Sequence, residues 1–164
     1  MTITGGSTIV TGGAALATNE NGGDANLIFL SDVTSDSTLE LASGVDTPDA
    51  EPGDAFVSFS GDATFTGGAT LTETNPGGDI VTLTFDGTDA QSFTGTIDGG
   101  DTDQGEIIIS NTSAGGVTFN DAIGAGSALK ALTVNTDASV QFDSDAFFAR
   151  RFTIQVQRFL TSFL

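Results

Sequence analysis

Apolar residues alternate with polar ones in short runs over most of this chain. Each run places apolar side chains at every second position, with Thr, Ser, Asp or Gly between them, which predicts half-buried β-strands. The apolar positions are Val57 and Phe59; Ala63 and Phe65; Ala69 and Leu71; Val81, Leu83 and Phe85; Phe93 and Ile97; Ile107 and Ile109; and Val117, Phe119 and Ile123. Glycine pairs such as Gly67-Gly68 and Gly115-Gly116 separate the runs and predict tight turns, because Gly reaches positive φ without steric strain. The first 145 residues therefore read as all-β.

A looser repeat lies on top of the strand pattern. Phe65, Phe93, Phe119 and Phe142 each open a similar motif, and successive positions are 28, 26 and 23 residues apart. A degenerate period of this length is typical of a β-solenoid, in which each coil buries its inward side chains only by stacking on its neighbours. The sequence thus predicts a parallel, β-helix-like solenoid. An antiparallel β-sandwich, which also has short strands with frequent turns, is the alternative.

The last 19 residues differ from the rest and predict a C-terminal amphipathic helix. The apolar positions that would share one helical face are Phe148, Phe152, Val156, Phe159, Leu160, Phe163 and Leu164. A strand containing Phe152, Ile154 and Val156 is the competing interpretation. The segment would cap the solenoid, associate with another copy, touch a membrane, act as an export signal or reflect an altered reading frame; capping or self-association is the simplest of these.

These patterns divide the chain into two parts. Residues 1–145 form an acidic β-repeat domain, irregular over 1–54 and more regular over 55–145, and residues 146–164 form a basic tail or cap. Residues 47–54 hold two of the three prolines and have no apolar period, so they predict a loop. The start of the chain has neither the basic residues nor the apolar run of a secretory signal, so we expect a C-terminal or uncleaved signal or a longer parent protein.

Charge argues against nucleic acid as a partner. Of the 164 residues, 22 are acidic and four are basic, for a formal charge of -18. All 22 acids and a single cation, Lys130, lie in residues 1–145, whereas Arg150, Arg151 and Arg158 lie in the tail. A surface with this many acids repels the phosphate backbone of nucleic acids. Contact with a membrane is expected only through the basic residues 146–164.

The side-chain inventory argues against an enzyme. The chain has no His, Cys, Trp or Tyr, which removes the usual general base, the thiol nucleophile, zinc ligands and disulfides. Paired carboxylates alone would serve a glycosidase, but the Asp residues fall where turns need them. The 13 Phe side chains are expected in the interior. We therefore expect no catalytic residues.

Acidic turns suggest a calcium site. Hard cations take carboxylate and carbonyl oxygens from flexible loops, and the densest acidic turn runs from Asp98 to Glu106. Its four carboxylates, the candidate calcium ligands, belong to Asp98, Asp101, Asp103 and Glu106. In the alternative interpretation, Asp and Gly are ordinary turn residues and the charge keeps the protein soluble.

Residues 116–135, GVTFNDAIGAGSALKALTVN, resemble the Gly/Thr-rich repeats of bacterial β-strand-repeat surface proteins, including autotransporter-passenger and S-layer-like proteins. The resemblance extends over about residues 55–145 and implies an exported, repetitive module at the bacterial cell surface that acts in adhesion or lattice formation. It transfers no catalytic residues, because the matched positions are packing and turn positions.

Together these observations predict a non-enzymatic structural module of an extracellular or surface protein, acting by self-assembly into a lattice or filament or by adhesion. Self-association is the expected partnership. The alternative is a calcium-dependent adhesin module that binds a glycan or protein partner.

Overall fold

The structure, a computed structural model, describes residues 2–3, 8–11, 24–43, 53–74, 78–145 and 147–155. These residues form sixteen strands and contain no helix. All the strand pairs are parallel, which confirms the predicted all-β solenoid and shows that the antiparallel sandwich is wrong.

Three parallel sheets form the faces of the solenoid. Sheet A has the strand order β1-β4-β7-β10-β13-β15, sheet B has β11-β8-β5-β2, and sheet C has β16-β14-β12-β9-β6-β3. The bounds are β1 Thr2–Ile3, β2 Thr8–Thr11, β3 Ala25–Phe29, β4 Val33–Ser35, β5 Leu39–Ala42, β6 Ala55–Phe59, β7 Ala63–Phe65, β8 Ala69–Thr72, β9 Val81–Phe85, β10 Gln91–Thr94, β11 Ile97–Gly99, β12 Gln104–Ile109, β13 Val117–Phe119, β14 Leu129–Val134, β15 Val140–Phe142 and β16 Ala149–Ile154.

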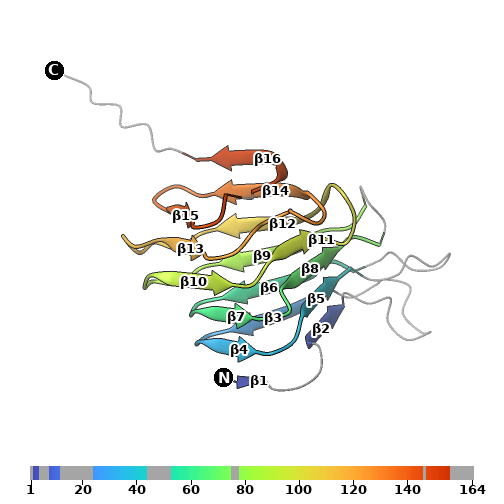
Figure 1. Ribbon diagram of the computed structural model, residues 1–164, viewed down its shortest axis with the longest axis horizontal. Coiled ribbons are helices and arrows are strands. Elements are labelled where there is room, and N and C mark those ends of the chain that lie inside the picture. The colour runs from blue at the N-terminus through green and yellow to red at the C-terminus, as the bar shows by residue number, and fades with distance from the viewer. Residues whose placement is uncertain are drawn as a thin grey trace.

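The chain visits the sheets in the constant order A, B, C, and each visit adds one strand or bridge to the stack. In the last two coils a single bridging residue replaces the sheet B strand, through the pairings of Ile97 with Ile123 and of Ile123 with Phe147. Figure 1 shows the result as a pile of strands with β1 at one end and β16 at the other. Every pairing along the pile therefore joins residues from successive coils.

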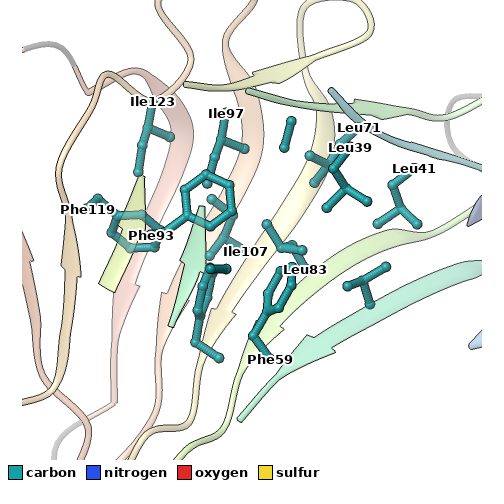
Figure 2. Close-up of a cluster of buried hydrophobic side chains, with 14 of the residues drawn as sticks. Leu39, Leu41, Phe59, Leu71, Leu83, Phe93, Ile97, Ile107, Phe119 and Ile123 are labelled. Atoms are coloured by element: carbon teal, nitrogen blue, oxygen red, sulfur yellow. The ribbon is translucent and has the colours of Figure 1, made fainter. Parts of the chain in front are cut away.

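Alternating side chains build the core from all three sheets. In β6, Ala55, Val57 and Phe59 are buried while the residues between them are half-buried. Parallel pairing stacks such residues into rows, and the row from Val57 continues through Leu83 and Ile107. Figure 2 shows Leu83 and Ile107 of this row inside the coil, together with Leu39 and Leu71 from sheet B. Each buried apolar side chain contributes roughly 1.5–3 kcal/mol, and stacking is what buries it.

Phenylalanine rings form a continuous chain of contacts inside the solenoid, as predicted, and some pairs are stacked while others, such as Phe85 and Phe119, meet edge to face. The Phe85 and Phe119 ring centroids are 5.2 Å apart, and those of Phe119 and Phe142 are 5.7 Å apart. Phe93, Phe119 and Phe142 occupy one row, but Phe93 pairs with Ala63 rather than with Phe65. The shift of two residues keeps both rings on the inner face, because side chains in a strand alternate with a period of two.

The coils shorten along the chain. Row partners are 30 residues apart at Leu27 and Val57, 24 apart at Leu83 and Ile107, and 20 apart at Leu132 and Phe152. Most of the difference comes from the connection between sheets B and C, which shrinks from residues 43–54 after β5 to residues 100–103 after β11. A spread this wide explains why the sequence repeat is degenerate.

Two of the predicted glycine turns are confirmed. Gly68 has φ of 80° and Gly116 has φ of 62°, and each donates its N–H to a carbonyl three residues back, at 2.7 and 3.0 Å. Gly95 has φ of 125°, and a Cβ there would collide with the carbonyl oxygen of Phe65. These positions favour glycine because a side chain would be strained in that backbone conformation. The pair Gly99-Gly100 was likewise expected to form a turn, but Gly99 is the last residue of strand β11.

The predicted C-terminal helix is wrong over residues 149–154, which form strand β16 instead. Phe152 pairs with Leu132 and Ile154 with Val134, so the competing strand interpretation is correct for these two residues. The edge of β14 offers backbone donors and acceptors that a short helix would leave unused. Val156 to Leu164 and the predicted loop over 47–52 lie outside the described residues, and the division at residue 145 stays a prediction.

Candidate functional site

The C-terminal end of the stack carries exposed apolar side chains at positions that are buried in earlier coils. Phe152 is 46% exposed and Ile154 is 58% exposed, whereas their row neighbours Leu132 and Val134 are buried. Phe148, which directly precedes β16, is 54% exposed. Among the described residues no strand pairs with the outer edge of β16. The last coil therefore has the inward pattern of a solenoid coil without a neighbour on its outer side.

Two hollows flank this end. One has a volume of about 620 Å³ and is lined by Asp103, Ala128, Phe147, Phe148, Ala149 and Arg150. The other, of about 410 Å³, is lined by Glu106, Lys130, Ala131, Arg150 and Arg151. All three cations of the described residues thus gather around the final strand of an otherwise acidic protein.

One of these cations joins two acids from different coils. The Lys130 Nζ lies 3.2 Å from Oε1 of Glu73 and 3.5 Å from Oε1 of Glu106. The Glu73 side chain is only 1% exposed, and the same Oε1 accepts the Gly105 N–H at 3.3 Å. Burial works to lower the pKa of Lys130, but the hydrogen bond and charge of Glu73, followed by those of Glu106, outweigh it and raise the pKa above 10.5.

Gln104 completes the surroundings of Glu73. Its Nε2 donates to the Glu73 carbonyl at 3.0 Å, and its Oε1 accepts the backbone N–H groups of Glu73 and Asp101 at 3.2 and 3.1 Å. Glu73, Gln104 and Lys130 are therefore a structural polar group holding three coils together. Sequence reasoning missed it, because no local pattern connects Glu73 with a lysine 57 residues away.

Each of the four predicted calcium ligands contacts a donor within the protein. Asp98 accepts the N–H of Gly126 at 2.7 Å, and Asp101 accepts the N–H of Thr102 at 2.7 Å. Asp103 pairs with Arg150 at 3.1 Å, and Glu106 faces Lys130. Within the part of the chain that is described, no group of three or more Asp or Glu residues is arranged to hold a metal ion. Calcium binding stays a prediction.

Acidic residues at the coil corners act as backbone acceptors. Asp24 accepts the N–H of Asp54 at 3.1 Å, Asp32 accepts that of Asp62 at 3.0 Å, and Asp62 accepts that of Ser92 at 2.7 Å. In each case the carboxylate reaches the residue about one coil further along. Hydrogen bonds to carboxylates are stronger than neutral ones, so the Asp-rich turns help to join the coils.

A buried amide pair has the same kind of role at the corner between sheets C and A. Gln91 Nε2 donates to the carbonyls of Phe59 and Gly61 at 2.8 and 2.9 Å, and Asn111 Nδ2 donates to Gln91 Oε1 at 2.7 Å. Both side chains are buried. The hydrogen bonds of both side chains therefore connect neighbouring coils, which is a structural role. The C-terminal end of the stack is the candidate functional site.

Among the described residues no helix is long and apolar enough to span a lipid bilayer. The resemblance to bacterial surface repeats stays a prediction. The sequence matches no known protein-family model, and no curated protein or solved structure shows significant similarity to it.

Proposed function

We propose that this chain is a non-enzymatic structural module that works by self-assembly, as part of an exported bacterial surface protein. The observation that carries the proposal is the end of the stack, where Phe152 and Ile154 continue buried rows but are 46% and 58% exposed. An exposed strand edge bordered by apolar side chains is a template for pairing with another chain. A neighbouring coil would bury these residues.

The position of the acids supports a structural role. Carboxylates at the coil corners accept backbone N–H groups, as Asp62 does for Ser92, and Glu73 is enclosed by Lys130 and Gln104. A carboxylate engaged in this way stabilises the stack. The surface setting and the lattice or filament follow from the resemblance of residues 116–135 to bacterial surface repeats.

The proposal is tested by measuring oligomer size against protein concentration by sedimentation velocity. We expect reversible association of the full chain, and we expect Ile154→Asp to shift the protein to monomer because a charge would be placed at the apolar end. Ile80→Asp is the matched control, since Ile80 is also an exposed isoleucine, at 41%, but precedes β9 in mid-stack. A wild-type protein that stays monomeric at every concentration, or equal losses in both variants, would refute the proposal.

A further inference from the structure

The strand at which the described stack ends and the strand at which it begins are consecutive in the coil order A, B, C. Each coil visits sheets A, B and C in turn, and the first described strand, β1, lies in sheet A. The final coil runs through β15 in sheet A and the bridge at Phe147, and it ends at β16 in sheet C. Sheet A is the next face after sheet C. A second copy placed beyond β16 would therefore continue the order without an interruption.

Strand direction also agrees between the ends. Because the pairs within sheet C are parallel, β3 and β16 run in the same direction across the stack. Neither the outer edge of β3 nor that of β16 is paired within the described residues. Translating a copy along the stack thus brings β3 beside β16 in the parallel arrangement that all internal pairs have.

Charges favour this orientation over an end-to-end contact between two identical surfaces. The strand β16 contains Arg150 and Arg151 and no acid. Strand β3 of the first coil is directly preceded by Asp24, and residues 24–43, which continue into β4 and β5 of the second coil, also contain Asp32, Asp36 and Glu40 and no cation. Two copies joined through β16 would oppose arginines with arginines, whereas β16 beside β3 brings the arginines toward Asp24 and the acidic end of the stack.

We propose that the C-terminal end of one copy docks on the N-terminal end of a second copy, so that β16 pairs in parallel with β3 of the next molecule. The proposal rests on the proposed self-assembly and adds that the copies associate head to tail, with the C-terminal end of one against the N-terminal end of the next. Continuing the rows places Phe152 against the half-buried Leu27 and Ile154 against Phe29 of the second copy. Such a contact joins two different surfaces, and each added copy leaves a free end for the next. Because the copies are related by translation, they form an open filament and not a closed ring.

The register of the contact can be tested by disulfide trapping, because the chain has no cysteine. Thr153 and Ile28 belong to the outward row that also contains Ser58 and Thr133. Strands in a sheet lie about 4.8 Å apart, which is within the usual Cα separation of a disulfide. Equal amounts of Thr153→Cys and Ile28→Cys are mixed, oxidised and analysed on a non-reducing gel. We expect a disulfide-linked dimer in the mixture and little in either variant alone.

Ser58→Cys mixed with Thr153→Cys is the matched control. Ser58 lies on the same outward row but between Ile28 and Thr84, where β6 is already paired on both sides. That mixture should give no dimer above background. If Thr153→Cys alone gives as much dimer as the mixture, the ends meet tail to tail and the polarity is wrong.

A second measurement separates this inference from the proposed function. If sedimentation shows assembly but the Thr153→Cys and Ile28→Cys mixture stays monomeric on the gel, self-assembly stands and the head-to-tail contact fails. If the wild-type protein does not assemble, both fail. As an independent check of the charges, Arg151→Glu should weaken assembly more than Arg151→Gln, and the difference should shrink as sodium chloride screens it. Equal effects at low salt would contradict the predicted opposition of charges.

Discussion

Replacing Lys130 by methionine tests the buried acid beside it. Methionine keeps most of the length of the lysine stem but removes the ammonium group that lies 3.2 Å from Glu73. The Glu73 carboxylate, 1% exposed, would keep the Gly105 N–H at 3.3 Å and lose its cation. Removing one partner of a fully buried ion pair costs about 3–5 kcal/mol. Because the Lys130 side chain is 34% exposed and water already screens the pair, we expect a loss of about 2–3 kcal/mol.

Two further variants make the reasoning specific. Glu106→Gln removes the other, 32% exposed acid at 3.5 Å and should change the unfolding free energy by roughly 0.5 kcal/mol. Combining Glu73→Gln with Lys130→Met removes both charges, and the neutral amide needs no cation. We expect the double variant to recover most of the loss caused by Lys130→Met alone.

The assay is urea unfolding followed by far-ultraviolet circular dichroism. A stability change appears as a shift in the urea midpoint at constant slope. The reasoning would be refuted if Lys130→Met were no more destabilising than Glu106→Gln, or if the double variant were as unstable as Lys130→Met. Either result would mean that Glu73 does not depend on the lysine.

Four other expectations follow from the same geometry. Because the pKa of Lys130 is raised in the folded protein, its stabilising effect is complete below pH 10.5 and is lost as the pH rises through the higher folded value. The urea midpoint of the wild-type protein should therefore fall over that pH range, and the midpoint of Lys130→Met should fall less. Phe93→Ala, at a fully buried ring, should cost about 3–5 kcal/mol, whereas Phe148→Ala, at a 54% exposed ring, should change stability by roughly 0.5 kcal/mol, as measured by urea unfolding. Gly95→Ala should lower stability by about 1–3 kcal/mol because of its φ of 125°, and Gly126→Ala, whose Cβ would meet only the Asp98 carboxylate at 3.2 Å, should lower it less. If the predicted calcium site exists, calcium should raise the melting temperature at fixed ionic strength and Asp101→Asn with Asp103→Asn should remove the rise; an equal rise with magnesium or sodium would indicate screening.

Local alternation was enough to predict the strands between Val57 and Ile123 and the side chains in them that face the interior, but not β1 to β5 in residues 2–42. Val57 and Phe59, or Leu83 and Phe85, lie two positions apart with polar residues between them, and they are buried as expected. This prediction succeeds because side chains point to opposite faces of any strand, whichever strand lies beside it. The same property makes register hard to predict. Aligning Phe65 with Phe93 is wrong by two residues, although both rings still face inward.

The sequence could not decide between helix and strand near the C-terminus. Phe148, Phe152 and Val156 fit a helical face, while Phe152 and Ile154 also fit a strand. Residues 149–154 become a strand because β14 offers an unpaired edge and a row of side chains to continue. That edge is supplied by residues about 20 positions earlier in the chain.

By itself, the sequence determined the strands between Val57 and Ile123, the interior phenylalanines of those strands and the acidic composition, since these depend on local alternation and on residue content. Only the tertiary structure decided the coil register, the strand at residues 149–154, the enclosure of Glu73 by Lys130 and the gathering of cations beside an apolar end. The physical reason is that each of these depends on which coil stacks on which. Stacking is fixed by connections that vary between coils, so residues far apart in the chain become neighbours without leaving a local signal.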